Sequence, residues 1–119
     1  MFLFRRNADR LTPDEARTRT DDGNAVLLDV RETREWEAGH APGAVHLPLS
    51  RLLAGTPLPP DAQGRPVVVI CRSGRRSRQA AELMASRGID ARDVSGGMLA
   101  WARAALPVVD DTGRGGRIA

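Results

Sequence analysis

The sequence contains no lysine and no tyrosine, and only one of its 119 residues is a cysteine. A single cysteine excludes an internal disulfide framework. Together with His40 and His46, the only two histidines, it offers too few ligands for a metal site, so we expect no metal. A free thiol persists in a reducing compartment, which predicts the cytoplasm. The arginine- and alanine-rich, lysine-free composition favours a bacterial source with a GC-rich genome.

Long apolar runs are also missing, since no stretch reaches the roughly 20 residues that a membrane span needs. The N-terminal segment 1–9 begins with the apolar run Met1–Phe4 and continues with Arg5 and Arg6. A secretory signal has its basic residues before a longer apolar run, so this segment does not fit one. We interpret 1–9 as an apolar and basic segment whose apolar start forms a strand or folds onto the core; a weak contact with a membrane or a partner is the less favoured alternative.

The charge balance is only modestly basic, because 18 arginines face 15 acidic residues and the formal net charge is +3. Aromatic residues amount to 3% and do not alternate with the arginines, whereas single-stranded nucleic acid needs basic and stacking groups together. We therefore expect no nucleic-acid partner. Hydrophobic residues amount to 41%, enough for one domain with an aliphatic core. The pattern specifies no oligomeric state.

Helical and strand patterns alternate along the chain. Thr12 and Glu15 around Pro13 form a capping box, which predicts a helix over 13–19. The run Val67–Ile70 is apolar and wholly β-branched, as in the buried centre of a parallel sheet. Further strands are expected at 25–28, 45–47 and 90–94, further helices at 32–38, 49–53, 77–87 and 98–104, and a loop at 55–66. This alternation predicts an α/β domain with a mostly parallel sheet, followed by a flexible polar tail over 110–119.

Cys71 lies directly after the strand Val67–Ile70, and ligands of parallel sheets bind beyond the carboxyl ends of the strands. The loop that follows, Cys71–Ser77, leads into a helix. Its backbone N–H groups and the helix N-terminus favour an anion, and its arginines add positive charge. Gly74 allows the left-handed backbone that a tight loop needs. We therefore predict a reactive thiolate rather than a structural buried cysteine.

The loop Cys71–Arg76, followed by Ser77, resembles the active-site loop C-R-S-G-x-R of rhodanese-domain sulfurtransferases. Three other regions resemble the same family, in the same order and with compatible spacing. They are Leu27–Arg31 with Glu35–Trp36, Gly39–Ala44, and Val94–Met98 with Ala100–Trp101 and Leu106–Val108. The resemblance covers about residues 10–109. It implies the rhodanese-like α/β fold, with a mostly parallel sheet of about five strands and helices on both faces.

The resemblance also implies a reaction without a cofactor. The thiolate of Cys71 would take the sulfane sulfur of thiosulfate or of a persulfide donor and hold it as a persulfide. An external thiol, a protein acceptor or cyanide would then remove that sulfur, because the chain has no second cysteine. The implied substrate-binding loop consists of Arg72, Ser73, Gly74, Arg75, Arg76 and Ser77. Residues implied to support it are Asp29, Arg31, Glu35, His40 and Trp101.

Two other functions remain possible from the sequence. A cysteine-dependent phosphatase or arsenate reductase places an arginine after five intervening residues, but here that position holds Ser77, so the loop is one residue too short for a phosphate. A persulfide carrier, or a protein-interaction module with little thiosulfate activity, is the stronger alternative. The presence of Cys71 in a full loop favours a catalytic role.

Overall fold

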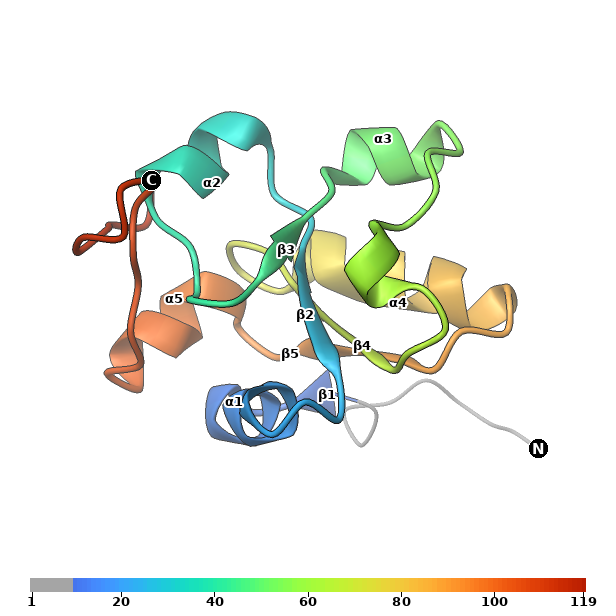
Figure 1. Ribbon diagram of the computed structural model, residues 1–119, viewed down its shortest axis with the longest axis horizontal. Helices are drawn as coiled ribbons and strands as arrows, with labels where there is room; N and C mark the ends of the chain where they lie inside the picture. The colour runs from blue at the N-terminus through green and yellow to red at the C-terminus, as the bar shows by residue number, and fades with distance from the viewer. Residues whose placement is uncertain (1–9) are drawn as a thin grey trace.

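A sheet of five parallel strands organises the computed structural model, which describes residues 10–119. Segment 1–9, interpreted from the sequence as a strand or as an end folded onto the core, lies outside the described residues. The strands are β1 (Arg10–Leu11), β2 (Val26–Asp29), β3 (Val45–His46), β4 (Val67–Ile70) and β5 (Ala91–Val94). Their spatial order is β1-β5-β4-β2-β3, so β4 lies in the middle of the sheet (Figure 1).

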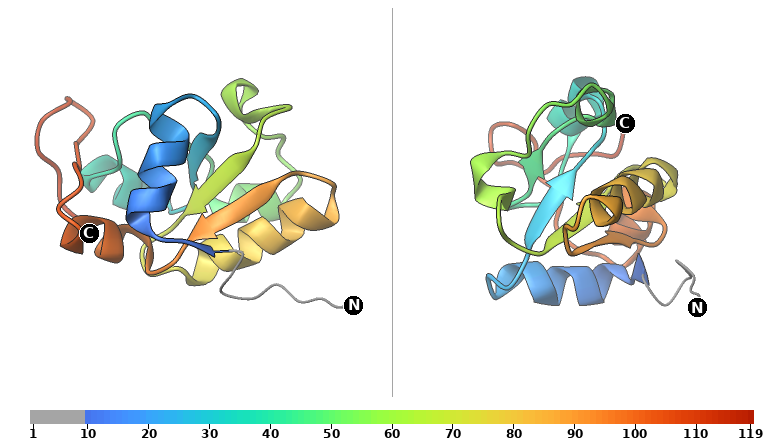
Figure 2. Two further views of the ribbon diagram at one scale, coloured as in Figure 1. Left: turned by 90° about the horizontal axis from the view of Figure 1, so that it is seen from below. Right: turned by 90° about the vertical axis from the view of Figure 1, so that its right-hand side faces the viewer.

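Helices cover both faces of the sheet (Figures 1 and 2). They are α1 (Pro13–Asp21), α2 (Thr33–Ala38), α3 (Leu49–Leu53), the 3-10 helix η2 (Pro60–Ala62), α4 (Arg75–Ser86) and α5 (Gly97–Arg103). None of the helices within residues 10–119 has the length and hydropathy needed to cross a bilayer.

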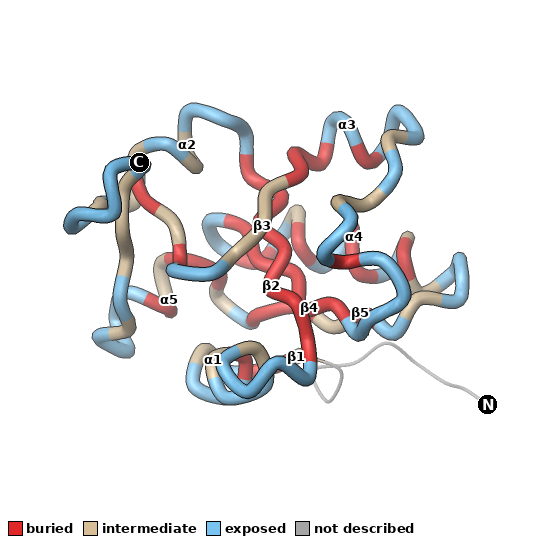
Figure 3. Tube along the Cα trace, viewed as in Figure 1, coloured by how far each residue is buried: buried red, intermediate tan, exposed pale blue. Residues whose placement is uncertain are grey.

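The central strands are buried on both faces. Since successive side chains of a strand point in opposite directions, they pack in two different clusters. Val67 and Val69 of β4 pack in the cluster that includes α3, η2 and α4. Val68 and Ile70 pack in the second cluster, with residues of α1 and α5. Figure 3 shows this buried centre running through β2 and β4. The expected α/β fold, with about five parallel strands and helices on both faces, is thus confirmed.

Three local features differ from the sequence prediction. The short strand β1 was not expected, since its two residues carry no pattern of their own and are ordered by pairing with β5. Helix α4 begins at Arg75, two residues earlier than expected. The cause is Gly74, whose left-handed backbone (φ 104°) turns the chain directly into the helix. The loop expected over 55–66 also contains η2.

The C-terminal segment 110–119, for which the sequence predicts flexibility, follows a defined course beside α2 (Figure 1). Val109 pairs with His40 as an antiparallel bridge, and the N–H of Arg117 donates to the carbonyl of Ala38 at 3.0 Å. Glycine at position 39 permits this approach, because a Cβ atom there would meet the backbone of Arg117. Backbone pairing, together with Ile118 packed against the second core cluster, places this segment.

Candidate active site

Cys71 lies at the carboxyl end of the central strand β4, in the loop that connects β4 to α4. The side chain is fully buried, with 0% exposure, and it is the one cysteine of the chain. A buried apolar strand ending in a polar, glycine-containing loop brings the sulfur to the edge of the sheet where ligands of parallel sheets bind.

Two groups contact the sulfur of Cys71. The backbone N–H of Gly74 donates to Sγ at 3.1 Å, and the thiol donates to Oγ of Ser77 at 3.4 Å. Ser77 is itself buried, and its hydroxyl donates to Oδ2 of Asp93 at 2.8 Å. The sulfur is therefore held between a loop amide and a hydroxyl that leads to a buried carboxylate.

The start of α5 holds the other side of the loop. The N–H of Met98 donates to the carbonyl of Cys71 at 2.7 Å, and the N–H of Leu99 donates to the carbonyl of Arg72 at 3.0 Å. A Cβ at position 97 would meet the same two carbonyls, so Gly97 is required for this close approach. The start of α5 thus satisfies these two loop carbonyls and holds the loop in place.

The loop arginines are used in different ways. Arg76 forms a two-pronged ion pair with Glu35 of α2, at 2.7 and 2.9 Å. This hydrogen bond lowers the pKa of Glu35 from 4.5 to about 2, against the effect of partial burial, and raises the pKa of Arg76. Arg72 and Arg75 are exposed, with Nε of Arg72 donating to the carbonyl of Ala119 at 3.0 Å. Arg72 and Arg75 therefore carry positive charge at the surface of the loop, while Arg76 ties the loop to α2.

A second ion pair, Asp29 with Arg31, fixes the chain between β2 and α2. Both side chains are fully buried, and Nη2 of Arg31 lies 2.7 Å from Oδ2 of Asp29. The same guanidinium donates to the carbonyls of Glu35 and Gly39. Breaking one partner of such a pair leaves an uncompensated buried charge. The pair therefore sets the position of α2, and through Glu35 the position of Arg76.

The aromatic residues brace the same region. Trp36 is stacked against His40, with ring centroids 3.6 Å apart, and against His46, at 4.8 Å. Nδ1 of His40 lies 2.8 Å from the carbonyl of Trp36, a loop hydrogen bond rather than a contact with Cys71. Trp101 is buried in the core, and its indole N–H donates to the carbonyl of Pro107 at 2.8 Å.

Most of the expected site residues thus gather around the loop, but their contacts differ. Gly74 and Ser77 touch the sulfur, whereas Ser73 is exposed. The sequence pattern predicted neither Asp93, which accepts the Ser77 hydroxyl, nor Arg10, which donates to Asp93 and to the carbonyl of Gly74. The signal available for Asp93 was an acidic residue inside an otherwise buried strand; nothing in the local sequence distinguished Arg10.

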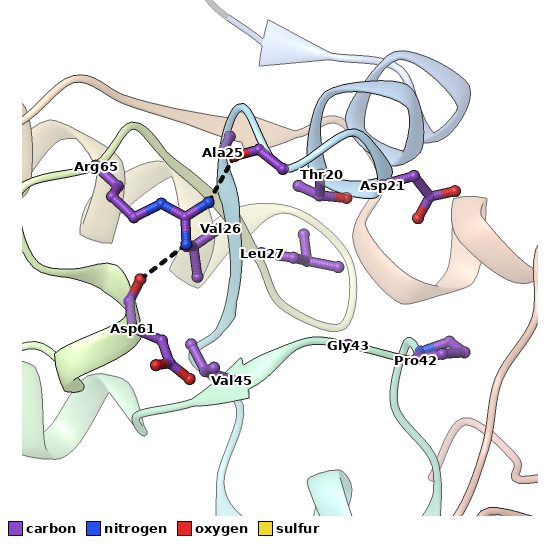
Figure 4. A pocket seen from close by; sticks show the side chains of 11 residues that line it. Thr20, Asp21, Ala25, Val26, Leu27, Pro42, Gly43, Val45, Asp61 and Arg65 are labelled. Carbon is purple, nitrogen blue, oxygen red and sulfur yellow. Dashed lines mark hydrogen bonds between the residues drawn. The ribbon is translucent and has the colours of Figure 1, made fainter.

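A separate pocket of about 290 Å³ lies near the amino ends of β2 and β3, away from the end of β4 that holds Cys71. Arg65 lies along one side of it and donates to the carbonyls of Gly23 and Asp61 (Figure 4). Two of its N–H groups are therefore occupied by backbone carbonyls. Within residues 10–119 no three His, Cys, Asp or Glu side chains gather closely enough to share a metal ion.

Residues 12–104 match the model of a known family, described as Rhodanese-like domain. The chain is similar to the adenylyltransferase and sulfurtransferase UBA4 of Yarrowia lipolytica, with 34% identity over 94 residues. That match covers 79% of this chain but 24% of the relative, so the chain spans about a quarter of that protein's length.

Two solved structures are similar over most of their own length. A rhodanese-related protein from Thermoplasma volcanium superposes with a TM-score of 0.72 at 26% identity, covering 84% of this chain and 96% of the other. A rhodanese homolog from the extremely thermophilic bacterium Thermus thermophilus superposes with a TM-score of 0.63 at 28% identity, covering 76% and 98%.

Proposed function

This chain belongs to the rhodanese-like domain family, and on that premise we propose that it is a sulfurtransferase that carries sulfane sulfur as a persulfide on Cys71. The observation that supports this most directly is the environment of the sulfur. A buried thiol contacts a loop amide at 3.1 Å and a hydroxyl at 3.4 Å, and both groups can donate a hydrogen bond to an anionic sulfur.

The reaction has two steps. In the first, the thiolate of Cys71 attacks the outer sulfur of thiosulfate, a new S–S bond forms, and sulfite leaves with the electron pair of the broken S–S bond. In the second, an external thiolate or cyanide attacks the terminal sulfur of the persulfide, and the thiolate of Cys71 is regenerated. No electrons are gained or lost overall, so the cycle needs no cofactor, and ping-pong kinetics are expected.

The anionic donor is attracted by the exposed arginines of the loop. Arg76 is paired with Glu35, so its charge is largely neutralised. Arg72 and Arg75 are exposed and supply positive charge for thiosulfate or another anionic donor. We expect the acceptor to be a small thiol or a protein in a reducing compartment such as the bacterial cytoplasm.

A persulfide carrier with little thiosulfate activity is the second candidate. The complete burial of Cys71 favours a carrier, because a protein that donates sulfur from its own persulfide can open the loop as it binds. The phosphatase alternative has the weaker support, since Arg76 is engaged by Glu35 and the position after five intervening residues holds Ser77.

The test is the intact mass of the reduced protein after incubation with thiosulfate, beside the Cys71→Ala variant. We expect the wild type alone to gain one sulfur atom, and cyanide to remove it as thiocyanate. A gain only from a persulfide donor would select the carrier. Failure of both donors to load Cys71 would refute sulfur transfer.

A further inference from the structure

One guanidinium, that of Arg10, is connected to both groups that contact the sulfur of Cys71. Its Nη2 donates to the carbonyl of Gly74 at 2.8 Å, and the N–H of the same glycine donates to the sulfur. On its other side, Nε and Nη2 donate to the two oxygens of Asp93, each at 3.0 Å. Asp93 accepts the hydroxyl of Ser77, which is the second partner of the sulfur.

Arg10, Asp93 and Ser77 form an almost completely buried cluster beside the loop. Asp93 is 2% exposed and Ser77 is fully buried, while the side chain of Arg10 is 17% exposed. A buried carboxylate needs a charged partner, and a guanidinium that donates two N–H groups is the most directional one. The fit is close, because a Cβ at position 74 would lie 2.7 Å from Nη2 of Arg10 and would force the guanidinium to shift.

We propose that Arg10 and Asp93 are positioning residues for sulfur transfer at Cys71, an inference that rests on the function proposed above. Arg10 holds the carbonyl of Gly74, in the peptide group that follows the glycine. It thereby restricts rotation about Gly74, which would turn the N–H in the preceding peptide group away from the sulfur. Through Asp93 it also fixes the hydroxyl of Ser77 beside the sulfur. Neither residue touches the sulfur or the donor.

The cluster also explains how Ser77 serves two forms of Cys71. With the thiol, the oxygen of Ser77 accepts from sulfur and its hydrogen is donated to Asp93. With the thiolate or the persulfide anion, the hydroxyl turns and donates to sulfur instead, and no covalent bond changes. Asp93 then loses one hydrogen bond, but the two bonds from Arg10 remain, so the buried carboxylate stays paired.

The test compares Arg10→Gln with Arg17→Gln, which removes an exposed arginine paired with Asp21 on the neighbouring helix α1. For Arg10→Gln we expect the rate constant of sulfur loading, per folded molecule, to fall about 10- to 100-fold, because reacting groups become misplaced. The KM for thiosulfate should stay within about twofold, since Arg72 and Arg75 are unchanged. The Arg17→Gln variant should load at the wild-type rate.

Hydrogen exchange of the Gly74 amide, followed by NMR, reads the positioning without any sulfur transfer. We expect it to become at least about tenfold faster in Arg10→Gln, while the amides of β4 keep their protection. If Arg10→Gln does not fold, Arg10→Lys provides the test. It keeps the charge beside Asp93 but not the planar fork, and its loading rate should fall by about 3- to 10-fold.

The two proposals fail in different ways. If the wild type accepts no sulfur from thiosulfate or from a persulfide donor, sulfur transfer is refuted, and the exchange of the Gly74 amide alone decides whether Arg10 is a positioning residue. The positioning role would be overturned if Arg10→Gln loaded sulfur at the wild-type rate. It would also be overturned if loading became slower while the hydrogen-exchange rate of the Gly74 amide stayed unchanged.

Discussion

Glu35 and Arg76 face each other with two parallel hydrogen bonds, from Nη1 to Oε1 at 2.7 Å and from Nη2 to Oε2 at 2.9 Å. They join α2 to the first turn of α4, so the loop that holds Cys71 is tied to a helix 41 residues away in sequence. An ion pair of this geometry makes the stability of the loop dependent on pH.

We predict that Glu35→Gln lowers the free energy of unfolding by about 2 kcal/mol at neutral pH, a value reduced for partial exposure of the pair. The pKa of Glu35 is lowered to about 2 in the folded state, so its contribution is complete above about pH 4.5 and is lost as the pH falls toward 2. Urea unfolding of the wild type and the variant between pH 7 and pH 2.5 measures this. The two stabilities should converge in acid.

The matched control is Glu37→Gln, which neutralises an exposed carboxylate on the same helix. Its stability should follow the wild type within about 0.5 kcal/mol at every pH. A constant gap between the wild type and Glu35→Gln down to pH 2.5 would contradict the role of the ion pair.

Ser77→Ala should slow sulfur loading while leaving the domain folded. The variant removes the hydroxyl that lies 3.4 Å from the sulfur, and we expect a loss of at least about tenfold in the loading rate. Asp93 keeps its two bonds from Arg10, so the free energy of unfolding should fall by only about 1–2 kcal/mol. Quenched loading reactions analysed by mass give the rate. Ser86→Ala, at the exposed far end of the same helix α4, should react as the wild type does.

Gly74→Ala should damage the loop more than backbone strain alone explains. Both Gly74 and Gly43 have positive φ angles, 104° and 80°, which cost a residue with a side chain about 1–2 kcal/mol. A Cβ at position 43 meets nothing within 4 Å, whereas one at 74 lies 2.7 Å from Arg10 and 3.1 Å from the backbone of Gly96. We expect Gly74→Ala to be destabilised by at least about 1 kcal/mol more than Gly43→Ala and to lose most of its loading rate. Equal losses in thermal unfolding would argue against the close contact.

Gly39→Ala should release the C-terminal segment. A Cβ at position 39 would meet the backbone of Arg117, so the variant should lose the hydrogen bond between Arg117 and Ala38. Trypsin should then cleave after Arg114 several-fold faster than in the wild type, because an unpaired segment is a better protease substrate. In Gly115→Ala, where a Cβ has open space, cleavage should not accelerate. Equally rapid cleavage of the wild type would instead support the flexible tail expected from composition.

The sequence was sufficient to predict the parallel sheet and the place of Cys71 within it. A strand such as Val67–Ile70, apolar on both faces, has the pattern typical of the centre of a parallel sheet, and the loop that follows it lies at its carboxyl end. The sequence pattern did not predict β1, because its two residues become a strand only through pairing with β5.

The separate roles of the arginines were decided by the tertiary structure. Local sequence specified an arginine-rich loop around a cysteine, since a strand end, a left-handed glycine and a helix start are all short-range features. It did not specify that Arg76 turns to Glu35 while Arg72 and Arg75 stay exposed. Nor did it specify that Arg10 supports the loop. Arg10 and Asp93 are 83 residues apart and become neighbours because β1 and β5 pair in the register that places one opposite the other. Such pairing is determined by the packing of the whole sheet, which no local pattern encodes.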